Sequence, residues 1–193
     1  MATLLSRRMG VAIAEELASK GAKVILVLGP SEIPVNKKIN TIRVTSASGM
    51  YDACINHLPE ANIIIMAAAV ADYAPDTVAD QKIKKNENGM TLNLKKTRDI
   101  LKRAGELKRN DQILVGFALE TNNEKENALK KLVEKNADLI VLNSLNDTNA
   151  GFQSDTNKIT IFDRRHKEYL FESKPKKDVA RDIVNTIMQY KNA

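Results

Sequence analysis

The stretch QILVGFALETNNEKENALKKLVEKNADLIVL, residues 112–142, decides the fold class of this chain. It begins with an apolar strand, Gln112–Ala118, continues as a long helix, Asn123–Lys135, and ends in a second apolar strand, Asp138–Leu142. A strand, a long helix and a second strand in this order are typical of two parallel strands joined by a helix that covers the sheet. The stretch therefore predicts an α/β fold with a largely parallel sheet.

The same alternation continues on both sides of this stretch. In chain order we expect a helix at Met9–Ala18, strands at Lys23–Leu28 and Thr41–Thr45, a helix at Met50–Leu58 capped by Ser48, a strand at Asn62–Ala68, a loop at Asp72–Asn88, a strand at Thr91–Lys95 and a helix at Asp99–Leu107. The C-terminal part changes character. Lys158–Phe162 and Glu168–Phe171 predict an antiparallel ribbon, followed by a helix at Lys177–Tyr190. We expect one domain over residues 1–193, α/β in class, with three layers, a mostly parallel Rossmann-like sheet and a C-terminal antiparallel ribbon.

Composition narrows the function classes. With a single cysteine, Cys54, an internal disulfide is impossible, and a reducing, cytoplasmic location fits best. The longest apolar run, Ile63–Ala71, is strand-sized, so no membrane association is expected. A net charge of +6 fits either an anionic ligand or a mildly basic surface, and aromatic residues at 4% speak against single-stranded nucleic acid as a partner. The two histidines are far apart in sequence, which gives a zinc site no basis.

Ligands of open α/β sheets bind beside the carboxyl ends of the strands. The segment Ala67–Tyr73 follows such a strand, and its small side chains would let a ligand approach the backbone. Asp72 would then hold a ribose hydroxyl or a metal-bound phosphate. Tight packing of alanines beside a solvated aspartate is the plainer alternative.

Three further features fit a nucleotide. The run Lys82–Lys85 would suit a lid over a triphosphate, and Phe117 would form a wall for a planar base. Lys131 and Lys135 lie four residues apart on one helix face, where they would neutralise phosphates. Each feature also has a structural interpretation: an exposed charged hairpin, a core phenylalanine and a solvated helix surface.

Taken together and in this order, the motifs AAAVADY, KIKK, GFALET, DLIVLN and GF-x-SD-x-N resemble the phosphopantothenoylcysteine synthetase family. The resemblance runs from about Met9 to the C-terminal helix. It implies that the chain ligates 4'-phosphopantothenate to L-cysteine in coenzyme A biosynthesis, with CTP as a substrate, Mg²⁺ as cofactor and an acyl-cytidylate intermediate. It also implies a homodimer, and a phosphopantothenoylcysteine decarboxylase half fused upstream in the native protein.

The resemblance also implies a set of site residues. Lys82 would contact the triphosphate and support the first, catalytic step, and the loop Lys84–Gly89 would be a flap. The remaining nucleotide contacts would be Met66, Ala67, Ala68, Asp72, Thr97, Arg98, Asp99, Ile100, Phe117, Lys131 and Lys135. Residues 97–100 would act through backbone donors at a helix N-terminus, and Arg98 replaces the proline usual in the family.

The N-terminus departs from the family pattern. The family opens with a strand and an Asn-x-Ser-Ser-Gly-Lys-Met-Gly segment, of which Ser6, Met9 and Gly10 match, while Thr3 stands at the asparagine and Arg7 at the glycine. Without the opening strand, the strands at residues 23–28 and 62–68 would be left with unpaired edges. We expect upstream residues to be missing. A fragment with a substitute strand and a defective variant are the alternatives, and nucleotide binding should outlast completed ligation.

Two other functions compete with ligation. A nucleotide-binding but catalytically impaired module would share most of these residues. An NAD(P)-dependent reductase would share the layer order, but no G-x-G-x-x-G follows any predicted strand.

Overall fold

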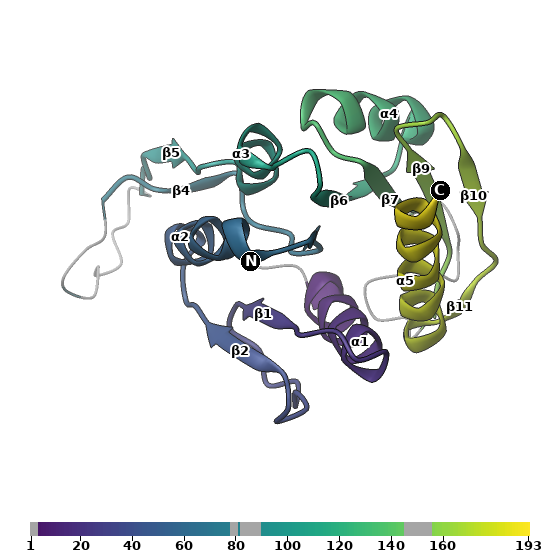
Figure 1. Cartoon of the computed structure of the whole chain (residues 1–193). Helices are drawn as coiled ribbons and strands as arrows, with labels where there is room; N and C mark the ends of the chain where they lie inside the picture. The colour runs from purple at the N-terminus through teal and green to yellow at the C-terminus, as the bar shows by residue number, and fades with distance from the viewer. Residues whose placement is uncertain (1–3, 78–80, 82–89, 145–155) are drawn as a thin grey trace.

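The computed structural model of the chain describes residues 4–77, 81, 90–144 and 156–193. Helices and strands alternate along most of it (Figure 1). The helices are α1 (Leu4–Ser19), α2 (Ala47–His57), α3 (Ile100–Leu107), α4 (Glu124–Glu134) and α5 (Lys176–Asn192), with a 3₁₀ turn at Leu58–Glu60. The strands are β1 (Ile25–Leu28), β2 (Asn40–Arg43), β3 (Ile63–Met66), β4 (Tyr73–Pro75), β5 (Leu94–Lys96), β6 (Ile113–Glu120), β7 (Leu139–Ser144), β8 (Thr156–Asn157), β9 (Ile159–Asp163), β10 (Glu168–Leu170) and β11 (Lys174–Pro175).

The main sheet has five strands in the order β10-β9-β7-β6-β3. Strands β3, β6 and β7 run parallel, with Met66 beside Gly116 and Ala118 beside Leu142. Strands β9 and β10 are antiparallel to their neighbours. The predicted α/β class is confirmed, and so is the parallel pair that residues 112–142 indicated. The predicted ribbon is not separate from the sheet, because β9 pairs with β7 and extends it.

Helices cover both faces of this sheet. Successive side chains of a strand point to opposite faces, so β6 sends Val115 into a core with α1 and α5, and Leu114 into a second core with α3 and α4. Helices α1 and α5 pack side by side on the first face (Figure 1). The three predicted layers are therefore present, and both cores are built from the apolar runs that predicted the strands.

The strands β1 and β2 do not belong to the main sheet. They form a separate parallel pair, with Leu28 beside Arg43. Within the described residues, β3 pairs with β6 on one side and ends the five-stranded sheet on the other. The two strands that were expected to flank a family strand thus lie in different sheets. The side chains of β1 and β3 are mostly half-buried, whereas the first four residues of β6 are buried.

Two local predictions were wrong. Helix α2 is capped by Ser46, whose hydroxyl accepts the N–H of Gly49 at 3.0 Å, and not by Ser48. The start of the predicted loop 72–88 is the strand β4, which pairs antiparallel with β5 through Tyr73 and Lys96. A three-residue strand offers too little alternation to be seen in sequence, and its partner lies about twenty residues later. This two-stranded arm extends from the body of the molecule (Figure 1).

Among the described residues, no helix combines the length and apolar character that crossing a bilayer would require.

Candidate active site

The segment after β3 is fixed to the turn that leads into α3. The backbone N–H of Thr97 donates to the carbonyl of Asp72 at 2.8 Å, and the Thr97 hydroxyl donates to the carbonyl of Ala71 at 2.7 Å. Two segments that are 25 residues apart in the chain, as Asp72 and Thr97 are, are thereby held together at the carboxyl end of β3. The structure thus brings the AAAVADY motif next to the predicted residues 97–100.

Asp99 begins helix α3 and is held from two sides. Its Oδ1 accepts the N–H of Lys102 at 2.9 Å, which caps the helix, and its Oδ2 accepts a hydrogen bond from Lys135 Nζ at 2.8 Å. Burial alone would raise the pKa of the Asp99 carboxyl, but the Lys102 N–H and the Lys135 ammonium outweigh it and hold this pKa below its usual value. The carboxylate is therefore ionised at neutral pH and engages one of the predicted nucleotide-binding lysines.

Lys131 lies in the same charge cluster. Burial lowers the pKa of its ammonium, and Lys135 lowers it further, while the carboxylates of Glu120, Asp99 and Asp72 act in the opposite direction. These interactions require the groups to lie near one another, beside the start of α3. The structure therefore brings Asp72, Asp99, Lys131 and Lys135 together from three segments of the sequence: the loop after β3, the start of α3 and the end of α4.

A close approach of two helices sets the geometry of this cluster. A Cβ on Gly105 of α3 would lie 1.9 Å from the carbonyl oxygen of Lys135, so only glycine fits here. The side chain of Asn136 also donates to the Gly105 carbonyl at 2.7 Å. Helix α3 is thus pressed against the end of α4, which places Asp99 within reach of Lys135.

Arg98 directs its side chain away from this cluster. Its Nη2 donates to Ser48 Oγ and to Asp52 Oδ1, both at 2.8 Å, and its guanidinium stacks 3.7 Å from the centre of the Tyr51 ring. Ile100, the next predicted residue but one, is buried at 7% exposure. In this arrangement both residues offer a ligand at the cluster only their backbone groups, and their contact with a nucleotide stays a prediction.

The predicted residues on β3 and β6 face opposite helix layers. Met66 packs on the α3 and α4 core, whereas Phe117 packs on the α1 and α5 core. Ala67 is half-buried and Ala68 is exposed directly after β3. Phe117 and Lys131 thus lie on opposite faces of the sheet: Phe117 faces α1 and α5, whereas Lys131 belongs to α4 on the other face. Lys82 and the flap Lys84–Gly89 lie outside the described residues.

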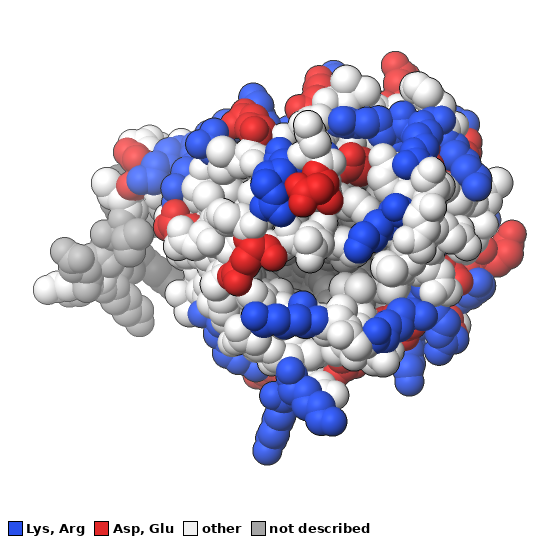
Figure 2. Space-filling model, in the orientation of Figure 1, with Lys and Arg blue, Asp and Glu red and all other residues white. Residues whose placement is uncertain are grey.

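Lysine and arginine side chains gather around the hollowed middle of the face seen in Figure 2 and over α4, with acidic side chains between them. A mixed, net basic surface of this kind attracts an anionic ligand.

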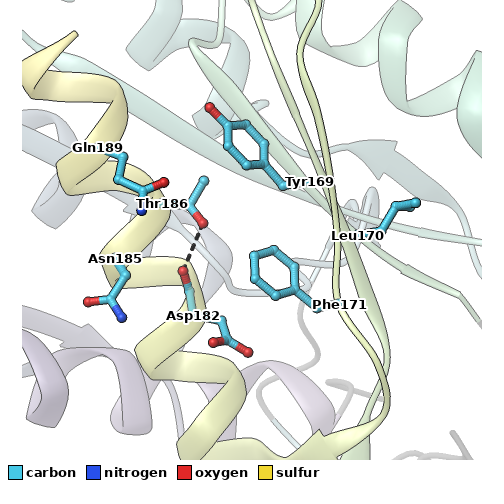
Figure 3. A pocket seen from close by; sticks show the side chains of 7 residues that line it. All are labelled: Tyr169, Leu170, Phe171, Asp182, Asn185, Thr186 and Gln189. Carbon is cyan, nitrogen blue, oxygen red and sulfur yellow. Dashed lines mark hydrogen bonds between the residues drawn. The ribbon is translucent and has the colours of Figure 1, made fainter.

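A separate cavity of about 310 Å³ lies between β10 and α5 (Figure 3). It is lined by Tyr169, Leu170, Phe171, Asp182, Asn185, Thr186 and Gln189. Its carboxylate, Asp182, pairs with Lys174 at 2.7 Å and is thereby neutralised. The lining contains neither a cation nor any of the predicted nucleotide-binding residues, so this cavity is not the candidate site.

Several residues around the site make contacts that the sequence did not predict, and Ser48, predicted as a helix cap, is one of them. Ser48, Tyr51 and Asp52 hold Arg98, and Asn127 bonds to Glu120 at 3.2 Å. The contacts of Arg98 with Ser48 and Asp52 span 50 and 46 residues of the chain, and no local pattern signals them. Asn143 belongs to the DLIVLN motif, and its position at the end of β7 was the available signal.

Comparisons with known proteins identify the family of this chain. Residues 3–190 match the family model described as DNA/pantothenate metabolism flavoprotein C-terminal domain. The chain is 45% identical over 181 residues to the coenzyme A biosynthesis bifunctional protein CoaBC of Bacillus subtilis (strain 168), covering 93% of this chain and 44% of that protein. It is 48% identical over 184 residues to a cysteine/cysteine sulfinic acid decarboxylase of an unknown prokaryotic organism, covering 95% of this chain and 51% of that protein. The chain thus spans about half the length of these curated relatives.

A solved structure is also similar. The crystal structure of the C-terminal domain of a coenzyme A biosynthesis bifunctional protein CoaBC superposes with a TM-score of 0.80 at 38% identity, covering 96% of this chain and 84% of that one. The arrangement of layers and strands described above is therefore that of this domain.

Proposed function

Because this chain belongs to the DNA/pantothenate metabolism flavoprotein C-terminal domain family, as a phosphopantothenoylcysteine synthetase domain, we propose that it ligates 4'-phosphopantothenate to L-cysteine with CTP. The observation that carries the proposal is the charge cluster beside the start of α3. There Lys131 and Lys135 lie among the carboxylates of Asp72 and Asp99. Two cations beside a helix N-terminus suit a polyphosphate, because both the charges and the backbone N–H groups attract anions.

The proposed reaction has two steps. A carboxylate oxygen of 4'-phosphopantothenate attacks the α-phosphorus of CTP, the bond to the bridging oxygen breaks, and pyrophosphate leaves with that electron pair. The amine of cysteine then attacks the acyl carbon of the acyl-cytidylate. The bond from that carbon to the cytidylate oxygen breaks, CMP leaves, and the amine loses a proton as the amide forms.

The residues of the cluster would act mainly by position and charge. Lys131 and Lys135 would neutralise the triphosphate and the departing pyrophosphate, since fixed charges stabilise developing negative charge without reorganisation. Lys82 remains the predicted residue for support of the first step. Asp99 would hold Lys135 and the start of α3 in place before the nucleotide arrives.

The residues present suit Mg²⁺ as a companion of the nucleotide. Among the described residues, no three His, Cys, Asp or Glu side chains form a metal cage. Mg²⁺ typically binds through one or two carboxylates together with substrate phosphates and water, so a cage is not required. The exposed carboxylate of Asp72 would be one such group. Mg²⁺ would supply neutralisation of phosphate charge, and Asp72 would orient the nucleotide toward Lys131.

We further propose a cytoplasmic homodimer. The arm formed by β4 and β5 exposes apolar side chains, with Tyr73 at 58%, Leu92 at 48% and Leu94 at 55% exposure. Exposed apolar patches of this kind mark protein contacts more often than solvated surface. Light scattering of wild type and Leu94→Asp tests the assignment, which predicts a monomer for the variant.

The test of the ligase function measures both steps. Purified chain is given CTP, 4'-phosphopantothenate and cysteine, and pyrophosphate and the amide product are followed separately. Lys131→Ala should lower the rate of pyrophosphate release by about 10- to 1000-fold. Lys130→Ala is the matched control, because Lys130 lies on the same helix with its side chain 68% exposed. Equal rates for the two variants would contradict the proposed site.

The balance between the two steps separates the ligase from a non-catalytic module. Thr3 stands where the family has the asparagine that acts on the acyl-cytidylate, so we expect pyrophosphate release to exceed amide formation. A chain that binds CTP but releases no pyrophosphate would be a nucleotide-binding module instead.

A further inference from the structure

Asn143 occupies an unusual position at the carboxyl end of β7. Its side chain is 8% exposed, and among the described residues its Oδ1 is the buried side-chain oxygen that has no hydrogen-bond partner. Buried polar atoms in native proteins are almost always satisfied, so such an exception calls for an explanation. Its place at the carboxyl end of a central parallel strand is where α/β proteins bind ligands.

Strand geometry shows which face Asn143 belongs to. Leu139 and Val141, two and four residues earlier on β7, pack into the core with α1 and α5. Because side chains two apart share a face, Asn143 points to that same side of the sheet. Phe117 packs on this side from the neighbouring strand β6, where it lies beside Val141. Asn143 is therefore the diagonal neighbour of Phe117: it lies two residues along β7 from Val141, the residue directly beside Phe117.

The cover over this face decreases along β6 toward the carboxyl end of the strand. Along the same row of β6, Val115 is 0% exposed, Phe117 is half-buried and Leu119, which lies beside Asn143, is 38% exposed. The helix layer thus becomes thinner over β6 toward its carboxyl end, while Asn143 on the neighbouring strand stays buried. A flat molecule that rested on Phe117 would present its edge to Asn143.

We infer that Asn143 is a specificity residue of the nucleotide site, whose amide oxygen accepts an N–H of the base, in CTP the exocyclic amine. The inference rests on the proposed function and adds to it the residue that recognises the base. An amide oxygen with no internal donor suits a ligand group that donates. The aromatic ring on the same face favours a planar base over the flexible chain of the acyl substrate.

The test varies protein and ligand together. Wild type, Asn143→Leu and Lys131→Ala are titrated with CTP and with the triphosphate of 2-pyrimidinone riboside, which is CTP without its exocyclic amine. Wild type should bind CTP about 10- to 100-fold more tightly than the analogue, because a buried acceptor would otherwise stay unpaired. Asn143→Leu should bind both with similar affinity. Lys131→Ala should weaken both and keep the ratio between them.

A second measurement separates recognition from folding. Leucine has the same number and branching of side-chain heavy atoms and removes an unsatisfied acceptor, so Asn143→Leu should melt at the same temperature as wild type or higher without ligand. Asn143→Ala repeats the binding test with a smaller side chain at this position. If either variant keeps the wild-type ratio between CTP and the analogue, the inference about Asn143 is wrong while the proposed function stands. If wild type binds neither triphosphate, the proposed function fails and the inference falls with it.

Discussion

Lys135 Nζ lies 2.8 Å from Asp99 Oδ2 and so joins the end of α4 to the beginning of α3. The side chains are 22% and 41% exposed, so this ion pair is only partly screened by water. The same aspartate caps α3 through its other oxygen. One carboxylate thus positions both a helix N-terminus and a cation that the ligase proposal assigns to the nucleotide. An arriving triphosphate would share Lys135 with Asp99 and would need no large rearrangement of either helix.

Replacing Asp99 should separate its two roles. Asn is as good a helix cap as Asp, so Asp99→Asn should remove only the ion pair, which we expect to lower the free energy of unfolding by at most about 1 kcal/mol. Asp99→Ala should also remove the cap and lower it by roughly a further 1 kcal/mol. Urea denaturation of the three proteins at neutral pH measures both differences.

The same pair predicts a pH dependence. The pKa of Asp99 is lower in the folded protein than in the unfolded chain, so its contribution is present above the unfolded value and is lost as the pH falls through the folded one. The gap between wild type and Asp99→Asn should therefore close in acid. A gap that widens as the pH falls would show that the sign of the shift is wrong.

Gly105 is predicted to be a position where an added methyl group is not tolerated. A Cβ there would lie 1.9 Å from the backbone oxygen of Lys135 and 3.1 Å from Asn136 Cβ, and a backbone atom cannot move aside cheaply. Gly105→Ala should destabilise the fold by about 1–3 kcal/mol. Gly10→Ala is the control, because Gly10 lies in helix α1 with nothing within 4 Å of the new Cβ. There alanine should stabilise the protein by about 0.5–1 kcal/mol. Melting temperatures that change in the same direction would refute the packing argument.

The order of the central elements could be predicted because each lies in a local pattern. Residues 113–120 and 139–144 are apolar runs that fill the core, and Asp99 stands one residue before α3, where a capping residue is expected. Part of what escaped prediction depends on partners distant in sequence. β4 exists because β5 supplies its hydrogen bonds. Ser46 and not Ser48 caps α2, and nothing in the spacing of the two serines distinguishes them.

The candidate site was predicted as a set of residues but not as a geometry. Strand order alone brings Asp72 and Phe117 to the same edge of the sheet. It does not say that Asp99 holds Lys135, that Arg98 turns toward Asp52, or that Phe117 faces the layer opposite Lys131. These are properties of tertiary packing, which determines which charged side chains lie close enough to pair.

Cys54 should be chemically inert in the folded protein. Burial raises the pKa of its thiol to about 11. Since the thiolate is the reactive species, only about one thiol in a thousand would be ionised at pH 8. Ellman's reagent should modify the native protein far more slowly than the protein in urea, where burial is lost. Modification at the same rate in both states would show that Cys54 is accessible and its pKa ordinary.

The affinity of the protein for CTP should fall at alkaline pH because Lys131 loses its proton there. Burial, reinforced by Lys135, holds the pKa of Lys131 below its usual value despite the nearby carboxylates. A triphosphate binds the ammonium form, so binding must take up a proton once the free protein has lost it. Above the pKa of Lys131, CTP affinity should therefore fall by up to about tenfold per pH unit.

Lys131→Arg keeps its charge, because a guanidinium does not titrate in this range, and should hold its affinity to higher pH. Calorimetric titration between about pH 7 and pH 10 measures the effect. Lys130→Arg is the control, since it changes an exposed lysine of the same helix and should leave the wild-type profile unchanged. If affinity falls in parallel in wild type and Lys131→Arg, another group is responsible and Lys131 does not contact the phosphates.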